Sequence, residues 1–207
     1  MKSFLRRYTE LPFVIDFLIT KELKLINPSF WDDRNDSYYI GQYANVKRFS
    51  FTYALCLTQT SETYHHWRVF SHGRSGVCIE FKKDIFLKDV KKIKGIRAED
   101  VKYETIKKLQ ANPPETSELP FLKRSAFKDE KEFRLIYGQR ANGGLIFSIP
   151  ISFDSVNKII LSPWLPKETA KNIKKVLKNI ADCSDIHIYQ STLVDNENWK
   201  KLAKNGA

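Results

Sequence analysis

The sequence has few cysteines, the residues that cross-link a chain through disulfides or bind a structural metal. Its 207 residues include only three cysteines, Cys56, Cys78 and Cys183. They are odd in number, far apart and form no C-x-x-C pair, which disfavours a zinc site. Each cysteine stands in an apolar run, so we predict buried, reduced thiols. A chain of this length also buries enough surface to fold without disulfides or metals.

Long hydrophobic runs and glycine-rich loops are missing as well. The apolar stretch over 13–19 is short and interrupted by Asp16, unlike a secretory signal. No segment approaches the roughly 20 apolar residues of a membrane span. We therefore expect a cytoplasmic protein with no membrane partner. The absence of a G-x-G-x-x-G pattern or a phosphate loop disfavours the common nucleotide-binding folds.

What the chain has instead is positive charge. Lys and Arg outnumber Asp and Glu by 35 to 24, which gives a net charge of +11. Such an excess attracts polyanions, so RNA or DNA is the expected partner. The alternative is that lysines simply solubilise the surface, because many are spread over residues 82–108 and 167–178.

Strands and helices alternate along the sequence without a regular βαβ order. Strands are expected over 3–8, 23–26, 51–57, 76–81, 133–137, 144–149, 156–161 and 186–189. Helices are expected after Pro12, over 65–70 and after Pro166. The strands over 133–137 and 144–149 are predicted to form a hairpin. This pattern predicts an α+β fold, in a single domain over 1–207, with a mostly antiparallel sheet and flanking helices.

The segment Trp31-Asp-Asp-Arg-Asn-Asp36 is predicted to be a charged turn with a structural role. Its short side chains are expected to bond neighbouring backbone amides, and Arg34 to neutralise the acids. A divalent-metal site is the alternative.

Two segments carry residues suited to binding a nucleotide. In the first strand, alternation places Arg7 and Thr9 on one face and Arg6 and Tyr8 on the other. An arginine there suits a diphosphate because its planar fork binds oxyanions in pairs. A basic surface strand is the alternative.

The second segment is the aromatic helix that begins near Tyr64. Together with Ser75, its side chains are suited to stacking on a base or a nicotinamide ring and to holding phosphate; they are Tyr64, His65, His66, Trp67 and Arg68. Trp67 is alternatively a core anchor. Adjacent histidines on a helix diverge, which excludes a shared metal between His65 and His66.

The third candidate is the carboxylate pair Glu130 and Glu132 at the start of a strand. In an extended chain both side chains point to one side, where two close carboxylates raise each other's pKa. They would orient and polarise a substrate. A solvated strand end is the alternative.

Several segments resemble a widespread bacterial domain family of unknown function. They are LRRYT, NPSFWDDRND, the run from Tyr53 to Phe81, V-K-Y, LPFLKR and DEKEFRLIY. Members of that family have a Trp-centred helix before Gly-Val-Cys-Ile and a later Glu-x-Glu-aromatic-Arg strand. The resemblance covers about residues 3–140 and implies no settled reaction.

The order of strands is also similar to the Arg-Ser-Glu layout of mono-ADP-ribosyltransferases. This similarity implies an ADP-ribosyltransferase-like fold with a split sheet and NAD as the cofactor. It implies Arg7 as the diphosphate clamp, Glu132 as the catalytic carboxylate and Glu130 as its substrate-orienting partner. The chain has no Ser-Thr-Ser, so Thr58, Ser61 or Ser75 would stand in for the middle serine.

The leading hypothesis is therefore a NAD-dependent ADP-ribosyltransferase that modifies nucleic acid or a nucleic-acid-associated protein. Glu132 would stabilise the oxocarbenium ion that forms when nicotinamide leaves, and Tyr8, Tyr64 or Trp67 would hold the nicotinamide. The expected setting is an intracellular toxin of a toxin–antitoxin or phage-defence system, with an antitoxin protein as a possible partner. Glu132→Gln is expected to abolish activity without changing stability.

Two other functions stay open. A ribonuclease would use His65 or His66 as general acid or base, with Arg68 stabilising the phosphorane. A non-catalytic, basic nucleic-acid-binding module would need no cofactor, although the chain has no RNP aromatics or GXXG loop.

Overall fold

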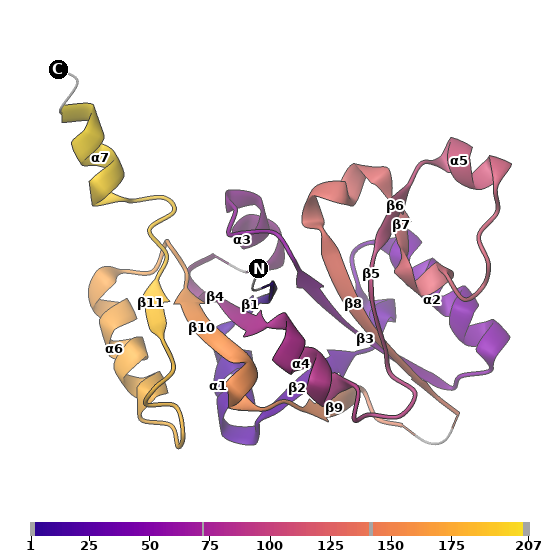
Figure 1. Cartoon of the computed structure of the whole chain (residues 1–207), viewed down its shortest axis with the longest axis horizontal. Helices are drawn as coiled ribbons and strands as arrows, with labels where there is room; N and C mark the ends of the chain where they lie inside the picture. Colours follow the sequence, from indigo (N-terminus) through magenta and orange to yellow (C-terminus); the bar gives the residue numbers. More distant parts are fainter. Residues whose placement is uncertain (1–2, 72, 141–142, 205–207) are drawn as a thin grey trace. The chain divides into compact units, whose positions relative to one another are not determined.

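The computed structural model describes residues 3–71, 73–140 and 143–204. The chain forms two compact units whose segments alternate along the sequence (Figure 1). Unit 1 comprises Met1–Arg6, Lys21–Thr60 and Lys82–Ser155. Unit 2 comprises Arg7–Thr20, Ser61–Phe81 and Val156–Ala207. Because the segments interleave, no single cut in the chain separates the units, and one domain over 1–207 stays a prediction.

Unit 1 is built around the central strand β3 (Phe51–Thr58). Along its full length β3 pairs antiparallel with β8 (Glu132–Gln139), and β8 pairs with β5 (Arg97–Asp100). β3 also pairs antiparallel with β2 (Glu22–Ile26) and with β1 (Phe4–Glu10), and β2 pairs with β9 (Ile146–Pro150). Six of the eight residues of β3 are buried, as a continuous apolar run predicts for a central strand.

Helices complete the main part of unit 1. They are α2 (Arg34–Lys47), α4 (Lys83–Val90), α5 (Ile106–Ala111) and the 3-10 turn η4 (Ser125–Glu130). A small parallel pair, β6 (Lys102–Glu104) with β7 (Leu122–Arg124), stands apart from the main sheet. One apolar cluster joins α2 to the sheet through Ile40, Tyr43, Ala54, Phe121 and Ile136.

The second half of the predicted charged turn is helical, because α2 begins at Arg34. Asp33 caps α2, and its side chain accepts hydrogen bonds from the backbone N–H groups of Asn35 and Asp36 at 3.1 and 3.3 Å. A short acidic side chain at this position satisfies amides that have no partner inside the helix. The predicted structural role is confirmed at Asp33. Asp36 pairs with Arg134 rather than being neutralised by Arg34.

The predicted hairpin of the strands over 133–137 and 144–149 is wrong. β8 pairs with β3 and β5, whereas β9 pairs with β2. Part of the expected turn, residues 141 and 142, lies outside the described residues. Long-range pairing with β2 therefore outweighs the short connection between neighbouring strands.

Unit 2 has its own mostly antiparallel strands. The hydrogen-bonded order is β11 (Ile188–Gln190), β10 (Val156–Leu161), β4 (Gly76–Lys82) and β1, whose residues from Arg7 onward belong to this unit. β10 runs antiparallel to β4 and parallel to β11. The predicted α+β class with a mostly antiparallel sheet and flanking helices is thus confirmed within each unit.

The helices of unit 2 are α1 (Leu11–Thr20), α3 (Tyr64–Phe70), α6 (Lys167–Lys178) and α7 (Glu197–Lys204). α6 begins after Pro166, as predicted, and lies along β11 (Figure 1). Its buried residues are Ala170 and Leu177, whereas Val176 is exposed. Within the described residues, no helix is long and apolar enough to span a membrane.

Candidate functional site

The candidate residues are divided between the two units. Unit 1 contains Glu130 and Glu132. Unit 2 contains Arg7, Tyr8, Thr9, Tyr64, His66, Trp67, Arg68 and Ser75.

Glu130 and Glu132 converge on the ammonium group of Lys123. Lys123 Nζ lies 2.7 Å from Glu130 Oε2 and 3.5 Å from Glu132 Oε2. The intervening Lys131 has φ 43°, so the chain turns there between η4 and β8 and is not extended. The carboxylates therefore share a side as predicted, but through a left-handed residue and a common cation instead of strand alternation.

Arg134 is the centre of this cluster and is completely buried. Its guanidinium forms paired hydrogen bonds with Asp36 at 2.7 and 2.6 Å and with Glu132 at 2.7 and 2.9 Å. A fifth bond, 2.8 Å long, goes to the carbonyl oxygen of Pro120. All five N–H donors of the arginine are thus used. The indole of Trp31 lies against the guanidinium, with its ring centroid 5.2 Å from Arg134 Cζ.

Three buried carboxylates, Asp36, Glu130 and Glu132, share two cations here, Arg134 and Lys123. Burial raises the pKa of Asp36 and of Glu130, and Arg134 and Lys123 respectively offset only part of the effect. Burial would also raise the pKa of Glu132, but Arg134 and Lys123 more than compensate, so its pKa falls below the usual value. Glu132 is therefore held as a carboxylate, and Glu130 is the group more easily protonated.

A basic, a hydroxyl-bearing and an acidic residue are in register on neighbouring strands of unit 1. Arg6 of β1 is in register with Thr58 of β3, and Thr58 is in register with Glu132 of β8. Directly paired residues on adjacent strands project to the same face of a sheet. The hydroxyl of Thr58 donates to the carbonyl oxygen of Glu130 at 2.5 Å, and Arg6 donates to the carbonyl oxygen of Thr60 at 2.6 Å.

The sequence predicted only part of this alignment of Arg6, Thr58 and Glu132. The resemblance to mono-ADP-ribosyltransferases implied Arg7 as the clamp, whereas Arg6 is the residue that pairs with Thr58. Arg7 and Thr9 are half-buried in the part of β1 that belongs to unit 2. Only the pairing partner of β1 identifies which arginine belongs with the hydroxyl and the carboxylate.

Three of the proposed cofactor-binding residues are core residues of unit 2. Tyr8, His66 and Trp67 are at most 4% exposed, and the Tyr8 ring packs edge-on against Trp67. Trp67 Nε1 donates to Glu62 at 2.7 Å, and Ser191 donates to the same carboxylate. Trp67 thus matches the alternative of a core anchor.

His66 has a structural role at the start of α3. Its backbone N–H donates to Thr63 Oγ1 at 3.1 Å, and its ring Nδ1 is 2.6 Å from the same hydroxyl. Thr63 is the N-cap of α3. Because His66 lies in the core, the ribonuclease alternative would depend on the exposed His65.

Tyr64 and Arg68 are exposed and form a stack with Trp164. Arg68 Cζ lies 4.4 Å from the Trp164 ring centroid and 5.2 Å from that of Tyr64, and its Nε donates to Tyr64 Oη at 2.9 Å. Tyr64 packs edge-on against Trp164. Among the residues that the structure describes, the two terminal nitrogens of Arg68 have no hydrogen-bond partner. We call these three residues the arginine stack; Trp164 had not been singled out from the sequence.

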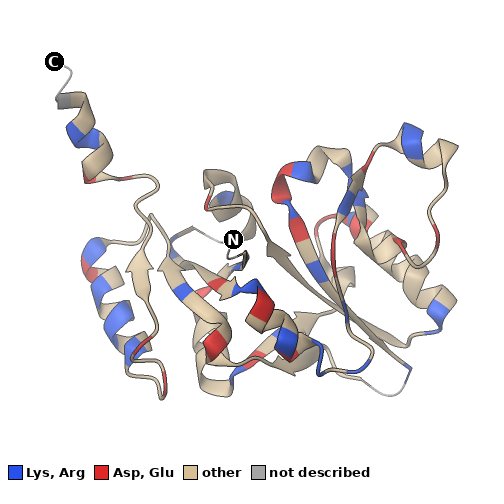
Figure 2. Ribbon diagram, viewed as in Figure 1, with Lys and Arg blue, Asp and Glu red and all other residues tan. Residues whose placement is uncertain are grey.

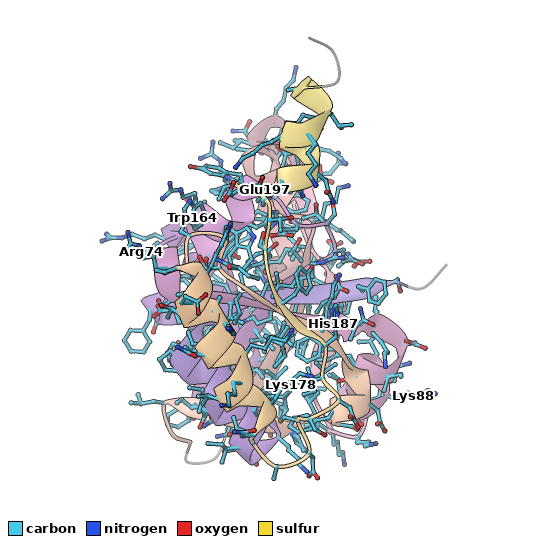
Figure 3. The ribbon with its side chains drawn as sticks, turned by 90° about the vertical axis from the view of Figure 1, so that its left-hand side faces the viewer. Arg74, Lys88, Trp164, Lys178, His187 and Glu197 are labelled. Carbon is cyan, nitrogen blue, oxygen red and sulfur yellow. The ribbon has the colours of Figure 1, made fainter. Side chains whose placement is uncertain are left out.

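Positive charge continues from the arginine stack along α6. Five lysines lie at intervals of three, four and seven along one side of the helix; they are Lys167, Lys171, Lys174, Lys175 and Lys178. Figure 2 shows this run of basic residues, and Figure 3 places Trp164 near the start of α6 and Lys178 at its end. Arg74 is exposed on the same side as Trp164 (Figure 3). Ser75 is also exposed, and its hydroxyl lies 3.5 Å from Glu10 Oε2.

Comparison with known proteins adds a family match without a function. Residues 66–135 match the family model described as "Protein of unknown function (DUF2971)". The match begins in α3, includes β4 and ends in β8, so it contains the Trp-centred helix, Gly-Val-Cys-Ile and Glu-x-Glu-aromatic-Arg. It is shorter than the resemblance over 3–140 and does not reach Arg6 or Asp36. No curated protein matches the chain.

Proposed function

We propose that this protein is a NAD-dependent ADP-ribosyltransferase whose catalytic carboxylates lie in unit 1. The observation that carries the proposal is the register of Arg6, Thr58 and Glu132 on the adjacent strands β1, β3 and β8. It supplies in one place the basic, hydroxyl and acidic groups of the Arg-Ser-Glu layout. In this proposal Arg6 replaces Arg7 as the arginine that binds the diphosphate.

The electrostatics of the carboxylates support the same chemistry. Departure of nicotinamide from ribose develops positive charge at the ribose carbon, which an ionised carboxylate stabilises. Glu132 is held in that form by Arg134 and Lys123. Glu130 has a raised pKa and suits proton exchange with an acceptor. Thr58 positions Glu130 through its backbone carbonyl.

The test is transfer of label from isotopically labelled NAD to RNA, DNA or proteins of a cell lysate. Arg6→Ala is expected to lower label transfer by about tenfold to a hundredfold, since it removes a charge-assisted contact with the diphosphate. Arg7→Ala is the matched control, one residue away on the same strand, and is expected to retain most activity. No transfer by the wild-type protein to any acceptor would refute the proposal, and a larger loss in Arg7→Ala would return the clamp to that residue.

A second candidate function, binding of single-stranded nucleic acid by unit 2, is favoured by the arginine stack. Exposed aromatic rings and arginine planes stack on bases, and nearby lysines neutralise phosphates. The exposed Tyr64 and Arg68 provide the stacking groups, and the lysines of α6, which begins three residues after Trp164, provide the charge. This surface would bind nucleic acid in a protein without catalysis.

Binding of a fluorescent single-stranded oligonucleotide at several salt concentrations tests this surface. Arg68→Ala combined with Trp164→Ala is expected to weaken binding by at least tenfold, because stacking contributes about 1–3 kcal/mol per base. Lys174→Ala combined with Lys175→Ala should instead reduce the salt dependence. Equal binding by both double variants and the wild type would exclude this surface.

A further inference from the structure

The ammonium group of Lys123 lies among three carboxylates of unit 1. Its Nζ is 2.7 Å from Glu130 Oε2, 3.5 Å from Glu132 Oε2 and 3.9 Å from Asp36 Oδ2. Lys123 comes from β7, Asp36 from α2, and the two glutamates from the end of η4 and the start of β8. The side chain of Lys123 is 9% exposed, so water screens these contacts weakly. One ammonium group therefore acts on all three carboxylates.

The two cations of this cluster serve different carboxylates. All five N–H donors of Arg134 are used by Asp36, Glu132 and a backbone carbonyl oxygen. Glu130 instead accepts a hydrogen bond from Lys123. Burial raises the pKa of Glu130, and the hydrogen bond and charge of Lys123 lower it. The ionisation of Glu130 therefore depends on Lys123, whereas Glu132 is also held by Arg134.

Other titratable groups on the elements around Glu130 are neutral, exposed or paired elsewhere. Tyr103 of β6 accepts the backbone N–H of Glu132, and Cys56 of β3 lies beside the Glu132 carboxylate. Burial raises the pKa of both groups, so both are neutral. The remaining charged residues of β6, β7 and η4, with the residue that follows η4, are Lys102, Glu104, Arg124, Lys128, Asp129 and Lys131. The charges that act on Glu130 are thus those of Lys123, Glu132 and Asp36.

We propose that Lys123 is a positioning residue that keeps Glu130 ionised beside Glu132 until Glu130 accepts a proton. The inference rests on the proposed transferase function. In that reaction the bond between ribose and nicotinamide breaks, and its electron pair goes to nicotinamide. An oxygen or nitrogen of the acceptor bonds to the ribose carbon, and its proton passes to Glu130. Lys123 stays paired after this step, because Glu132 and Asp36 lie 3.5 and 3.9 Å from its Nζ.

The ionisation of Glu130 is measured directly by a carbon-13 NMR titration of the glutamate carboxyl groups, with Glu130→Gln to assign the signal. Lys123→Met removes the ammonium group and should raise the titration midpoint of Glu130 by about one pH unit or more. Lys123→Arg keeps the charge and should restore most of the wild-type midpoint. Lys128→Met is the matched control, at an exposed lysine of η4, and should titrate like the wild type.

Label transfer from NAD, measured over a range of pH, tests the consequence for catalysis. Transfer requires ionised Glu130, so the activity of the wild type should fall as the pH drops through the pKa of Glu130. In Lys123→Met this fall should occur at higher pH, so that transfer is reduced at neutral pH and recovers as the pH is raised. A merely structural role of Lys123 would instead lower transfer by the same factor at every pH.

The two measurements distinguish this inference from the transferase function. An unchanged midpoint of Glu130 in Lys123→Met, or a loss of transfer that is equal at every pH, would overturn the role of Lys123. A raised midpoint without label transfer by the wild type would support the control of Glu130 by Lys123 and refute the transferase function alone. If Lys123→Met does not fold, Lys123→Gln replaces it in both measurements, since glutamine keeps a hydrogen-bond donor without the charge.

Discussion

Replacing Arg134 by methionine is expected to lower the free energy of unfolding by about 3–5 kcal/mol, because the change strands buried carboxylates without their cation. Arg134 is completely buried and bonds Asp36, Glu132 and the Pro120 carbonyl oxygen. Methionine fills similar space but provides no donor. The effect is measured by urea unfolding followed by circular dichroism.

The control for this experiment is Arg124→Met, the same substitution at an exposed position of β7. Surface changes of this kind usually alter stability by less than about 0.5 kcal/mol. If both variants unfold at the same urea concentration, Arg134 does not hold unit 1 together.

Replacing Glu132 by glutamine is expected to affect both stability and catalysis. Glutamine keeps the shape but removes the charge that bonds Arg134, which should cost about 1.5–3 kcal/mol of stability. If the proposed transferase function holds, label transfer from NAD should also fall by about 10²–10³, since the electrostatic partner of the oxocarbenium ion is lost. From sequence alone, a change in activity with unaltered stability was expected. The burial and pairing of Glu132 now argue against unaltered stability.

The pH dependence separates the stability effect from the catalytic one. The pKa of Glu132 is lowered in the folded protein, so its contribution is fully present above the unfolded value of about 4.3. This contribution is lost as the pH falls through the lower folded pKa. The difference in unfolding free energy between wild type and Glu132→Gln should therefore shrink on acidification. A difference that stays constant from neutral to acidic pH would contradict the ionic role of Glu132.

Patterns confined to one segment were enough to predict much of the fold. The apolar run over 51–57 and the Gly-Val-Cys-Ile run each predicted a buried strand, and both are present as β3 and β4. Pro166 and the periodic apolar residues after it predicted α6. In these segments the signal depends on the residues of the element itself, because burial on one or both faces shows in the local pattern.

α2 was missed because its helical signal is weak in the sequence. The segment that begins at Asp33 is rich in polar and aromatic residues, and among its buried residues only Ile40 and Tyr43 are large and apolar. Its first turn is stabilised by the Asp33 cap and by the pairing of Asp36 with Arg134, 98 positions away. A contact between residues so far apart in sequence does not alter the hydrophobic periodicity of either segment. The hairpin prediction failed for the same reason, since β9 pairs with a distant strand.

The sequence by itself determined the α+β class and the positive charge, and it singled out Glu130 and Glu132 as a candidate pair of neighbouring carboxylates. Only the tertiary structure decided that these carboxylates meet Lys123 and Arg134, and that Arg6 rather than Arg7 aligns with Thr58. Secondary structure follows from local periodicity, which a sequence displays. The ionisation state of a carboxylate and the neighbour of a strand depend on groups brought together from distant parts of the chain, and one sequence does not encode these in a visible pattern.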